Sequence, residues 1–292
     1  MGFPVVPLSS DPRSAWPVRL PRLRPLLLVI TLLTAAWLWT PGGLSPAAAA
    51  QVTAPTDQTK GYRESITGTL VAFEMVPVSG GQVTVEGSAV QVNPFLISRT
   101  EVTWDMYDVF ALGLDGSKGS VDATTRPSQP YGAPDYGWGH AGYPVISVTR
   151  AAAEAFCTWL SSKTGKRYRL PTEAEWVRAA ELAADGSDEG ARDGMTWHRG
   201  NAKGTTHPVG KRKPDALGLH DLFGNAAEWV TTADGDLVTR GGSFRDPLEE
   251  TGPTARAVQD SSWNERDPQL PKSNWWLSDG PFVGFRIVMS EQ

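Results

Sequence analysis

The order of apolar and polar residues first indicates a group of β-strands. From Thr69 the chain is rich in β-branched residues, and residues 83–85 and 90–92 alternate apolar and polar side chains with a period of two. Such alternation is typical of strands that bury one face. We assign residues 51–68 to a linker, because the first part of this segment is polar and has little periodicity.

Three later stretches have the spacing of amphipathic helices. The first follows Thr103, a predicted helix cap. In the second, four apolar residues lie at i, i+3, i+4 and i+7 between a Thr149 cap and Gly165. The third starts at a capping box, Thr172–Glu175, and should extend to about Ala184. We therefore interpret the two glutamates of this box as structural residues, not as an acid–base pair.

Loops dominate the rest of the chain. Residues 111–144 are rich in Gly, Pro, Ser and Asp but also carry Tyr and Trp, which favours an ordered, packed loop. Beyond Gly186 we expect only short strands, such as residues 237–239 and 285–288. This mixture predicts an α+β fold in a single compact, loop-rich domain over residues 69–290.

Five motifs in the chain resemble those of one known family. Residues 73–81 read FEMVPVSGG, residues 169–176 read RLPTEAEW, and residues 218–229 read GLHDLFGNAAEW. RGGSF follows at residues 240–244 and GFR at residues 284–286. In this order they resemble the sulfatase-modifying-factor family, whose best-known member is the formylglycine-generating enzyme.

The resemblance extends over about residues 70–288 and implies an α+β domain related to C-type lectins. It also implies where chemistry would take place. Formylglycine-generating enzymes oxidise a substrate cysteine with their own copper-holding cysteine pair, in the segment that corresponds to residues 244–283. That segment contains no cysteine here, and thiolates are the ligands that select cuprous copper. We therefore expect a family member that lacks the copper-binding cysteine pair and does not generate formylglycine.

The chain has a single cysteine, Cys157, in the apolar stripe of the second predicted helix. No neighbouring residue supplies the positive field that would stabilise a thiolate, so we interpret Cys157 as a small buried hydrophobic residue. A single cysteine also excludes an intramolecular disulfide.

The first 50 residues have the pattern of a secretory signal peptide. Four arginines precede an apolar run at residues 26–39, and small residues at 47–50 form a cleavage site before Gln51. The apolar run is shorter than the roughly 20 residues of a membrane span, which makes an uncleaved anchor the weaker alternative. We expect a periplasmic or secreted protein with no stable membrane span after cleavage.

The charge balance bears on the choice of partners. Removal of residues 1–50 takes away four arginines and one aspartate, which leaves 23 basic and 31 acidic residues and a net charge of −8. Such a balance argues against nucleic acids and anionic membranes as partners, and it permits cation binding.

Two interpretations are open for the stretch from Asn225 to Glu228. On one helical turn, the oxygens of these two side chains would converge on a hard cation such as calcium, with carbonyls around Ala226 completing the shell. The same spacing also fits an Asn helix cap with a Glu that reaches back to it. The predicted calcium ligands are Asn225, Ala226 and Glu228.

An iron site is a second metal hypothesis. Some members of the wider family use non-heme iron, although their ligands are largely histidines of a fused helical domain that this chain lacks. The four histidines lack the close spacing of a ligand motif, yet distant residues can meet in space. The candidates are His140, His198, His207 and His220, with Asp135 or Asp221 as a carboxylate ligand.

Residues 260–285 form the most unusual segment, with three tryptophans among carboxylates, asparagines and basic residues. Such an amphipathic lining is suited to gripping a peptide, protein or glycan, and the alternative is a long loop pinned by its tryptophans. The predicted groove residues are Trp263, Asn264, Arg266 and Trp275. We thus expect a binding or scaffold module, with a non-heme iron oxidoreductase as the alternative.

Overall fold

The computed structural model describes residues 60–116, 126–130, 132–184 and 189–289. The predicted signal peptide lies outside these ranges, as does the first half of the predicted linker, residues 51–59. Residues 62–65 correct the linker assignment, because they form a strand that pairs with residues 72–75. No helix within the described ranges is both long and apolar enough to cross a membrane.

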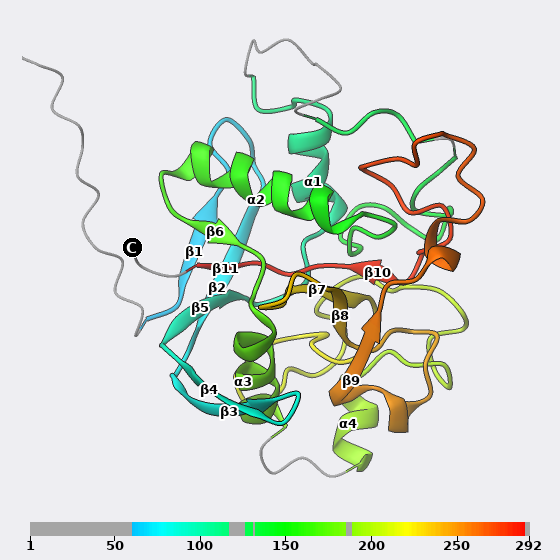
Figure 1. Ribbon diagram of the computed structural model, residues 1–292. Helices are drawn as coiled ribbons and strands as arrows, with labels where there is room; N and C mark the ends of the chain where they lie inside the picture. Colours follow the sequence, from blue (N-terminus) through cyan, green and yellow to red (C-terminus); the bar gives the residue numbers. More distant parts are fainter. Residues whose placement is uncertain (1–59, 117–125, 131, 185–188, 290–292) are drawn as a thin grey trace, which may run out of the picture. The chain divides into compact units, whose positions relative to one another are not determined.

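Three β-sheets organise the domain (Figure 1). The first has five strands in the order β1 (Tyr62–Ser65), β2 (Ala72–Val78), β5 (Phe95–Ser98), β11 (Val288–Met289) and β6 (Tyr168–Arg169). The second has four strands in the order β10 (Val283–Gly284), β7 (Ala227–Thr231), β8 (Leu237–Gly241) and β9 (Gly252–Val258). The third is the hairpin of β3 (Gly81–Val85) and β4 (Ser88–Val92). The α+β class predicted from the sequence is confirmed.

The first three helices begin and end close to the predicted signals, whereas a fourth helix and two 3-10 helices lie where only loops and short strands were expected. The helices are α1 (Trp104–Ala111), α2 (Arg150–Thr164), α3 (Glu173–Ala183), α4 (Glu189–Met195) and the 3-10 helices η1 (Leu248–Glu250) and η2 (Ser261–Asn264). Thr149 caps α2 through its side chain, and Gly165 ends this helix in the left-handed conformation. Both hydrogen bonds of the capping box are present at α3. Thr103 precedes α1 as predicted, but its side chain makes no capping hydrogen bond.

The five-stranded sheet separates two hydrophobic cores, because alternate residues of a strand point to opposite faces. In β5, Leu96 belongs to the core that packs α1 and α2, whereas Phe95 and Ile97 belong to the core that packs α3. Figure 1 shows α1 and α2 on one side of this sheet and α3 with the β3–β4 hairpin on the other. Apolar packing on both faces therefore fixes the sheet in the middle of the domain.

A buried ion pair joins the first two sheets. Arg286 lies between β10 and β11, and its guanidinium donates to both carboxylate oxygens of Glu228 on β7 at 2.7 Å. It also donates to the backbone carbonyls of Ser98, at 3.0 Å, and of His220, at 3.1 Å. Trp176 of α3 donates its indole N–H to the same glutamate at 2.8 Å. Neither charged side chain is exposed to solvent, so each depends on the other for its compensation.

Arg286→Met should lower the free energy of unfolding by about 3–5 kcal/mol, because it leaves the buried carboxylate of Glu228 without its cation. Chemical denaturation of the variant and of the parent protein measures this difference. A matched control is Arg99→Met, which breaks the half-exposed Arg99–Glu74 pair and should cost less than about 1 kcal/mol. Equal effects of the two substitutions would contradict the central role of Arg286.

Candidate binding site

The predicted groove residues do not line a single groove. Arg266 lines a cavity of about 300 Å³, called pocket A here, and Trp263 lines a separate cavity of about 520 Å³, called pocket B. Asn264 lines neither cavity, and its side chain accepts a hydrogen bond from the backbone N–H of Ser278 at 2.9 Å. Trp275 also lines neither and packs against the core around α1 and α2. The prediction of one aromatic groove is therefore corrected to two cavities.

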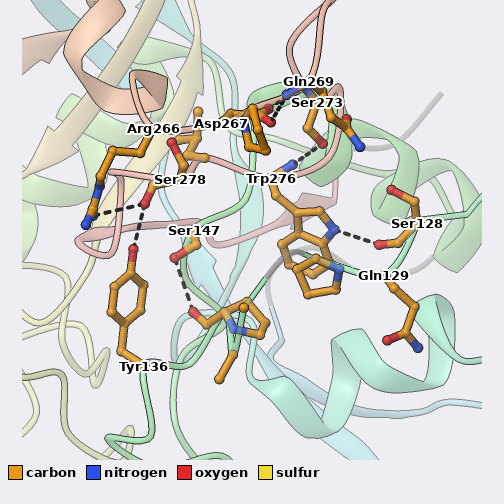
Figure 2. Close-up of a pocket in the computed structure, with 16 residues that line it drawn as sticks. Ser128, Gln129, Tyr136, Ser147, Arg266, Asp267, Gln269, Ser273, Trp276 and Ser278 are labelled. Atoms are coloured by element: carbon orange, nitrogen blue, oxygen red, sulfur yellow. Dashed lines mark hydrogen bonds between the residues drawn. The ribbon is translucent and has the colours of Figure 1, made fainter.

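Two loops that are distant in sequence form the walls of pocket A (Figure 2). Tyr136 and Arg266 lie on one side of the cavity, and Trp276 lies on the other with Ser128 and Gln129. The residues that line pocket A are Ser128, Gln129, Pro130, Gly132, Ala133, Pro134, Tyr136, Ser147, Arg266, Asp267, Pro268, Gln269, Ser273, Trp276, Leu277 and Ser278. The sequence predicted the second loop as a binding segment, but predicted the first only as part of an ordered, packed loop over residues 111–144.

Hydrogen bonds across pocket A hold its walls together. The indole N–H of Trp276 donates to the carbonyl of Ser128 at 2.7 Å, and the hydroxyl of Tyr136 donates to the carbonyl of Ser278 at 2.8 Å. The hydroxyl of Ser147 donates to a carbonyl of the first loop at 3.2 Å. These bonds preform the cavity and use the side-chain donors of Trp276, Tyr136 and Ser147.

Two residues of pocket A have a backbone conformation that is uncommon without glycine. Tyr136 has φ 54° and Ser147 has φ 63°, both in the left-handed region. Such a conformation costs about 1–3 kcal/mol at each position and persists where the surrounding structure enforces it, often at binding sites. Their coincidence at one cavity favours pocket A as a functional site.

At the rim of pocket A, Arg266 pairs with Asp279 through its side chain and its backbone N–H. Burial opposes ionisation of Asp279, but hydrogen bonds from Ser278 and Arg266 outweigh it and lower the pKa of this carboxyl to about 2. The Arg266 guanidinium is largely exposed, which leaves donors free to meet a ligand.

The helical turn assumed for Asn225 and Glu228 is wrong, because Ala227 begins strand β7. The amide of Asn225 donates to Glu101 and to the carbonyl of His207, and its oxygen accepts from the N–H of His207. Asn225 thus ties two loops together and caps no helix.

Calcium binding at Asn225, Ala226 and Glu228 is still a prediction, and it requires Glu228 to exchange Arg286 for the ion. A melting temperature that rises with calcium chloride after chelator treatment is its test.

Two further buried carboxylates, Glu101 and Asp221, lie near the ion pair of Arg286 and Glu228. Burial raises the pKa of Glu101 well above its usual range, and the negative charges of Asp221 and Glu228 raise it further. Burial also raises the pKa of Asp221 to about 6, against a hydrogen bond from the N–H of Gly210. One oxygen of Asp221 is buried without a partner. The buried centre therefore has more carboxylates than Arg286 alone can neutralise.

The predicted iron ligands do not converge on one point. His140 contacts Asp135 and Asp108, at 2.9 and 2.8 Å, whereas the other three histidines bond elsewhere. Those three contact Asp193 (His198), the carbonyl of Ala202 (His207) and the carbonyl of Arg212 (His220). Within the described ranges, no group of three or more His, Cys, Asp or Glu side chains has the geometry to hold a metal ion. We therefore derive no iron chemistry.

The two glutamates of the capping box have structural partners, as the sequence predicts. Glu175 binds Arg169 through two hydrogen bonds of 2.6 and 2.7 Å, and Glu173 accepts from Arg240 and Arg256. Cys157 is buried, and burial raises the pKa of its thiol far above the usual range. The interpretation of Cys157 as a small hydrophobic residue is consistent with this placement.

The fold and the buried centre define an α+β domain with two cavities and a single buried thiol. Residues 67–291 match the model of the sulfatase-modifying factor enzyme 1-like domain. Because this match covers most of the chain, the protein belongs to that family. The fold also resembles Treponema denticola variable protein 1, with a TM-score of 0.57 and 22% identity over 79% of this chain and 99% of that one. PvdO from Pseudomonas aeruginosa gives a TM-score of 0.56 at 25% identity over 80% of this chain and 98% of PvdO.

Three proteins with similar sequences have names that state different activities. A formylglycine-generating enzyme of Mycobacterium tuberculosis is 35% identical over 108 residues, which span 32% of this chain and 34% of that enzyme. The inactive C-alpha-formylglycine-generating enzyme 2 of Bos taurus is 32% identical over 127 residues, 37% of this chain and 40% of that protein. The serine/threonine-protein kinase Pkn1 of Chlamydia trachomatis is 38% identical over 96 residues, 31% of this chain and 14% of the kinase. Each match thus spans less than half of the relative.

Asp221→Asn should make stability less dependent on pH. The pKa of Asp221 in the folded protein, about 6, lies above its ordinary value of 3.8, so its protonated form stabilises the fold below about pH 4 and this contribution disappears as pH rises through 6. The loss amounts to on the order of 3 kcal/mol. Between about pH 4 and pH 7.5, the free energy of unfolding should decrease less with rising pH in the variant than in the parent protein. Parallel curves would contradict the buried-carboxylate account.

Proposed function

We propose that this protein is an exported, non-catalytic binding module of the family, and that pocket A receives an apolar side chain of a peptide or protein partner. The observation that supports this most is the preformed cavity whose two walls are tied together and whose lining residues Tyr136 and Ser147 are held in strained conformations. Export rests on the signal-peptide pattern of residues 1–50.

The lining of pocket A favours an apolar occupant. Pro130, Pro134, Pro268, Leu277 and the ring of Trp276 supply apolar surface. A volume of about 300 Å³ is at the lower end for ligand cavities and suits one bulky side chain. Burial of such a side chain stabilises a complex by roughly 1.5–3 kcal/mol.

A peptide fits this cavity better than a glycan does. Sugar hydroxyls need several free polar partners, but Trp276, Tyr136 and Ser147 already donate to carbonyls of the protein. Arg266 at the rim keeps exposed N–H groups, which suit a backbone carbonyl next to an inserted side chain. The ligand we propose is therefore a peptide segment with a large apolar residue.

The cysteine content of the chain supports a role without formylglycine chemistry. The chain has one cysteine, and it is buried in α2, so no cysteine pair is available to hold copper. The relatives support a role for the domain apart from catalysis. The bovine relative is called inactive, and in the chlamydial kinase the similar segment is 14% of the protein, as expected for a module attached to another activity.

Binding of single side chains to pocket A tests the proposal. Suitable probes are N-acetyl amides of tryptophan, leucine and glutamine, together with a neutral disaccharide, each titrated while amide NMR signals are followed. We expect the tryptophan and leucine probes to shift signals of residues 128–136 and 266–278, and the glutamine probe and the disaccharide to have little effect. Stronger binding of the disaccharide would overturn the choice of a peptide.

A variant that fills the cavity provides the specific control. Ala133 lines pocket A on an exposed loop, so Ala133→Phe should occupy the cavity without disturbing the core and weaken probe binding at least about tenfold. Ala141→Phe, at an exposed position of the same loop region outside the lining, should leave binding unchanged. If both variants bind like the parent protein, pocket A is not the site.

A further inference from the structure

Pocket B is a second cavity of about 520 Å³, built on the second sheet and separate in its lining from pocket A. Small side chains form part of its lining, because Ala227 lies on β7, Thr239 on β8 and Ala257 directly opposite Thr239 on β9. Trp263 and Phe282 also line it. Small residues on three neighbouring strands leave the space that larger side chains would fill.

The hydroxyl of Thr239 is the first sign of a ligand. Thr239 is 1% exposed, and its hydroxyl has no hydrogen-bond partner among the described residues. A buried hydroxyl without a partner loses its hydration without compensation, which native structures seldom tolerate unless another molecule completes the bond. Since Thr239 lines pocket B, a polar ligand in this cavity would supply the missing partner.

The charged residues of pocket B are the second sign. The guanidinium of Arg245 stacks on the ring of Phe282, 4.2 Å from its centroid, and forms no ion pair within the described ranges. Glu249 and Glu250 are exposed, and likewise have no ion-pair partner there. Arg256, by contrast, is engaged by Glu173 at 2.8 Å. Asp246 also lines the cavity, and one of its oxygens accepts from the backbone N–H and the hydroxyl of Ser243 at 2.7 and 2.9 Å. Pocket B thus presents one cation without an ion-pair partner, two exposed carboxylates and a third carboxylate held by Ser243.

We infer that pocket B binds a small zwitterion that carries both a carboxylate and an amine, the chemistry shared by free amino acids and short peptides. The stacked guanidinium of Arg245 offers a planar pair of donors to the carboxylate. Glu249 and Glu250 accept from the ammonium group, and the hydroxyl of Thr239 bonds a polar group of the ligand at the base of the cavity. A simple anion would be repelled by the two glutamates, and a simple cation would leave Arg245 unused.

This inference does not depend on pocket A. The first experiment is a thermal-shift screen of the full chain with each of the twenty standard amino acids and with glycylglycine, and the best probe is then titrated by calorimetry. We expect at least one of these zwitterions to bind and to raise the melting temperature. Preference for glycylglycine would indicate peptides as the source of the ligand, and preference for an amino acid would indicate free amino acids. Failure of every probe to bind overturns the inference.

Analogues of the best probe test the two charges separately. Acetylation of the amine removes the cation, and conversion of the carboxylate to an amide removes the anion. Each change should weaken binding at least about tenfold, because each removes a charge-assisted hydrogen bond. In Arg245→Gln, the acid and its amide should bind equally, whereas Arg63→Gln, at an exposed position of β1, should keep the difference. An Arg245→Gln variant that still prefers the acid contradicts the assignment.

Thr239→Val separates a role in binding from a role in folding. The substitution keeps the shape and removes a hydroxyl that has no partner, so the melting temperature should stay the same or rise. Binding of the probe should nevertheless weaken about tenfold. Thr84→Val, at an exposed position of β3, is the matched control and should bind like the parent protein. Unchanged binding in Thr239→Val shows that the hydroxyl does not contact the ligand and overturns this part of the inference.

Discussion

The architecture depends on one buried charge pair, Arg286 with Glu228. Two fully buried charges are costly unless their geometry is good and their remaining hydrogen bonds are made. Here Arg286 donates to the carbonyl of Ser98 at the end of β5 and to the carbonyl of His220 in a loop. The indole N–H of Trp176 in α3 donates a further hydrogen bond to Glu228. This pair and its hydrogen bonds therefore fix β5, β7, α3 and a loop relative to each other.

This arrangement explains how a chain with a single cysteine keeps the family fold. The motifs around residues 169–176, 218–229, 240–244 and 284–286 supply the ion pair, the capping box and Arg240, which holds Glu173. They specify the frame and leave the loops between them free to differ. In this chain, those loops carry prolines, tryptophans and unpaired charges around two cavities in place of a cysteine pair.

Local signals in the sequence predicted local structure well. Thr149, Gly165 and the box at Thr172–Glu175 mark helix ends because their hydrogen bonds are made within a few residues. The prediction of a helical turn at Asn225 was wrong for a related reason. Its spacing to Glu228 matches that of a helix cap, but its hydrogen-bond partners, Glu101 and the loop at His207, are distant in sequence. A residue that bonds over 124 positions gives no periodic signal.

The candidate site was predictable only in part. Arg266 and the unusual segment around it were recognised, but which of its tryptophans face a cavity depends on packing against residues 128–136. Thr239 was missed because an unpaired hydroxyl is a property of its surroundings and not of its sequence. Pairings between distant loops decide such sites, and a single sequence does not contain them in readable form.

The central claim is that this chain keeps the frame of the family while its one cysteine, buried in α2, cannot perform the oxidation. The most direct test incubates the purified chain, supplied with copper and oxygen, with a cysteine-bearing sulfatase peptide and follows the peptide by mass spectrometry. The account predicts that the cysteine stays unchanged while a known formylglycine-generating enzyme converts it in parallel. Formation of the aldehyde by this chain alone would contradict it.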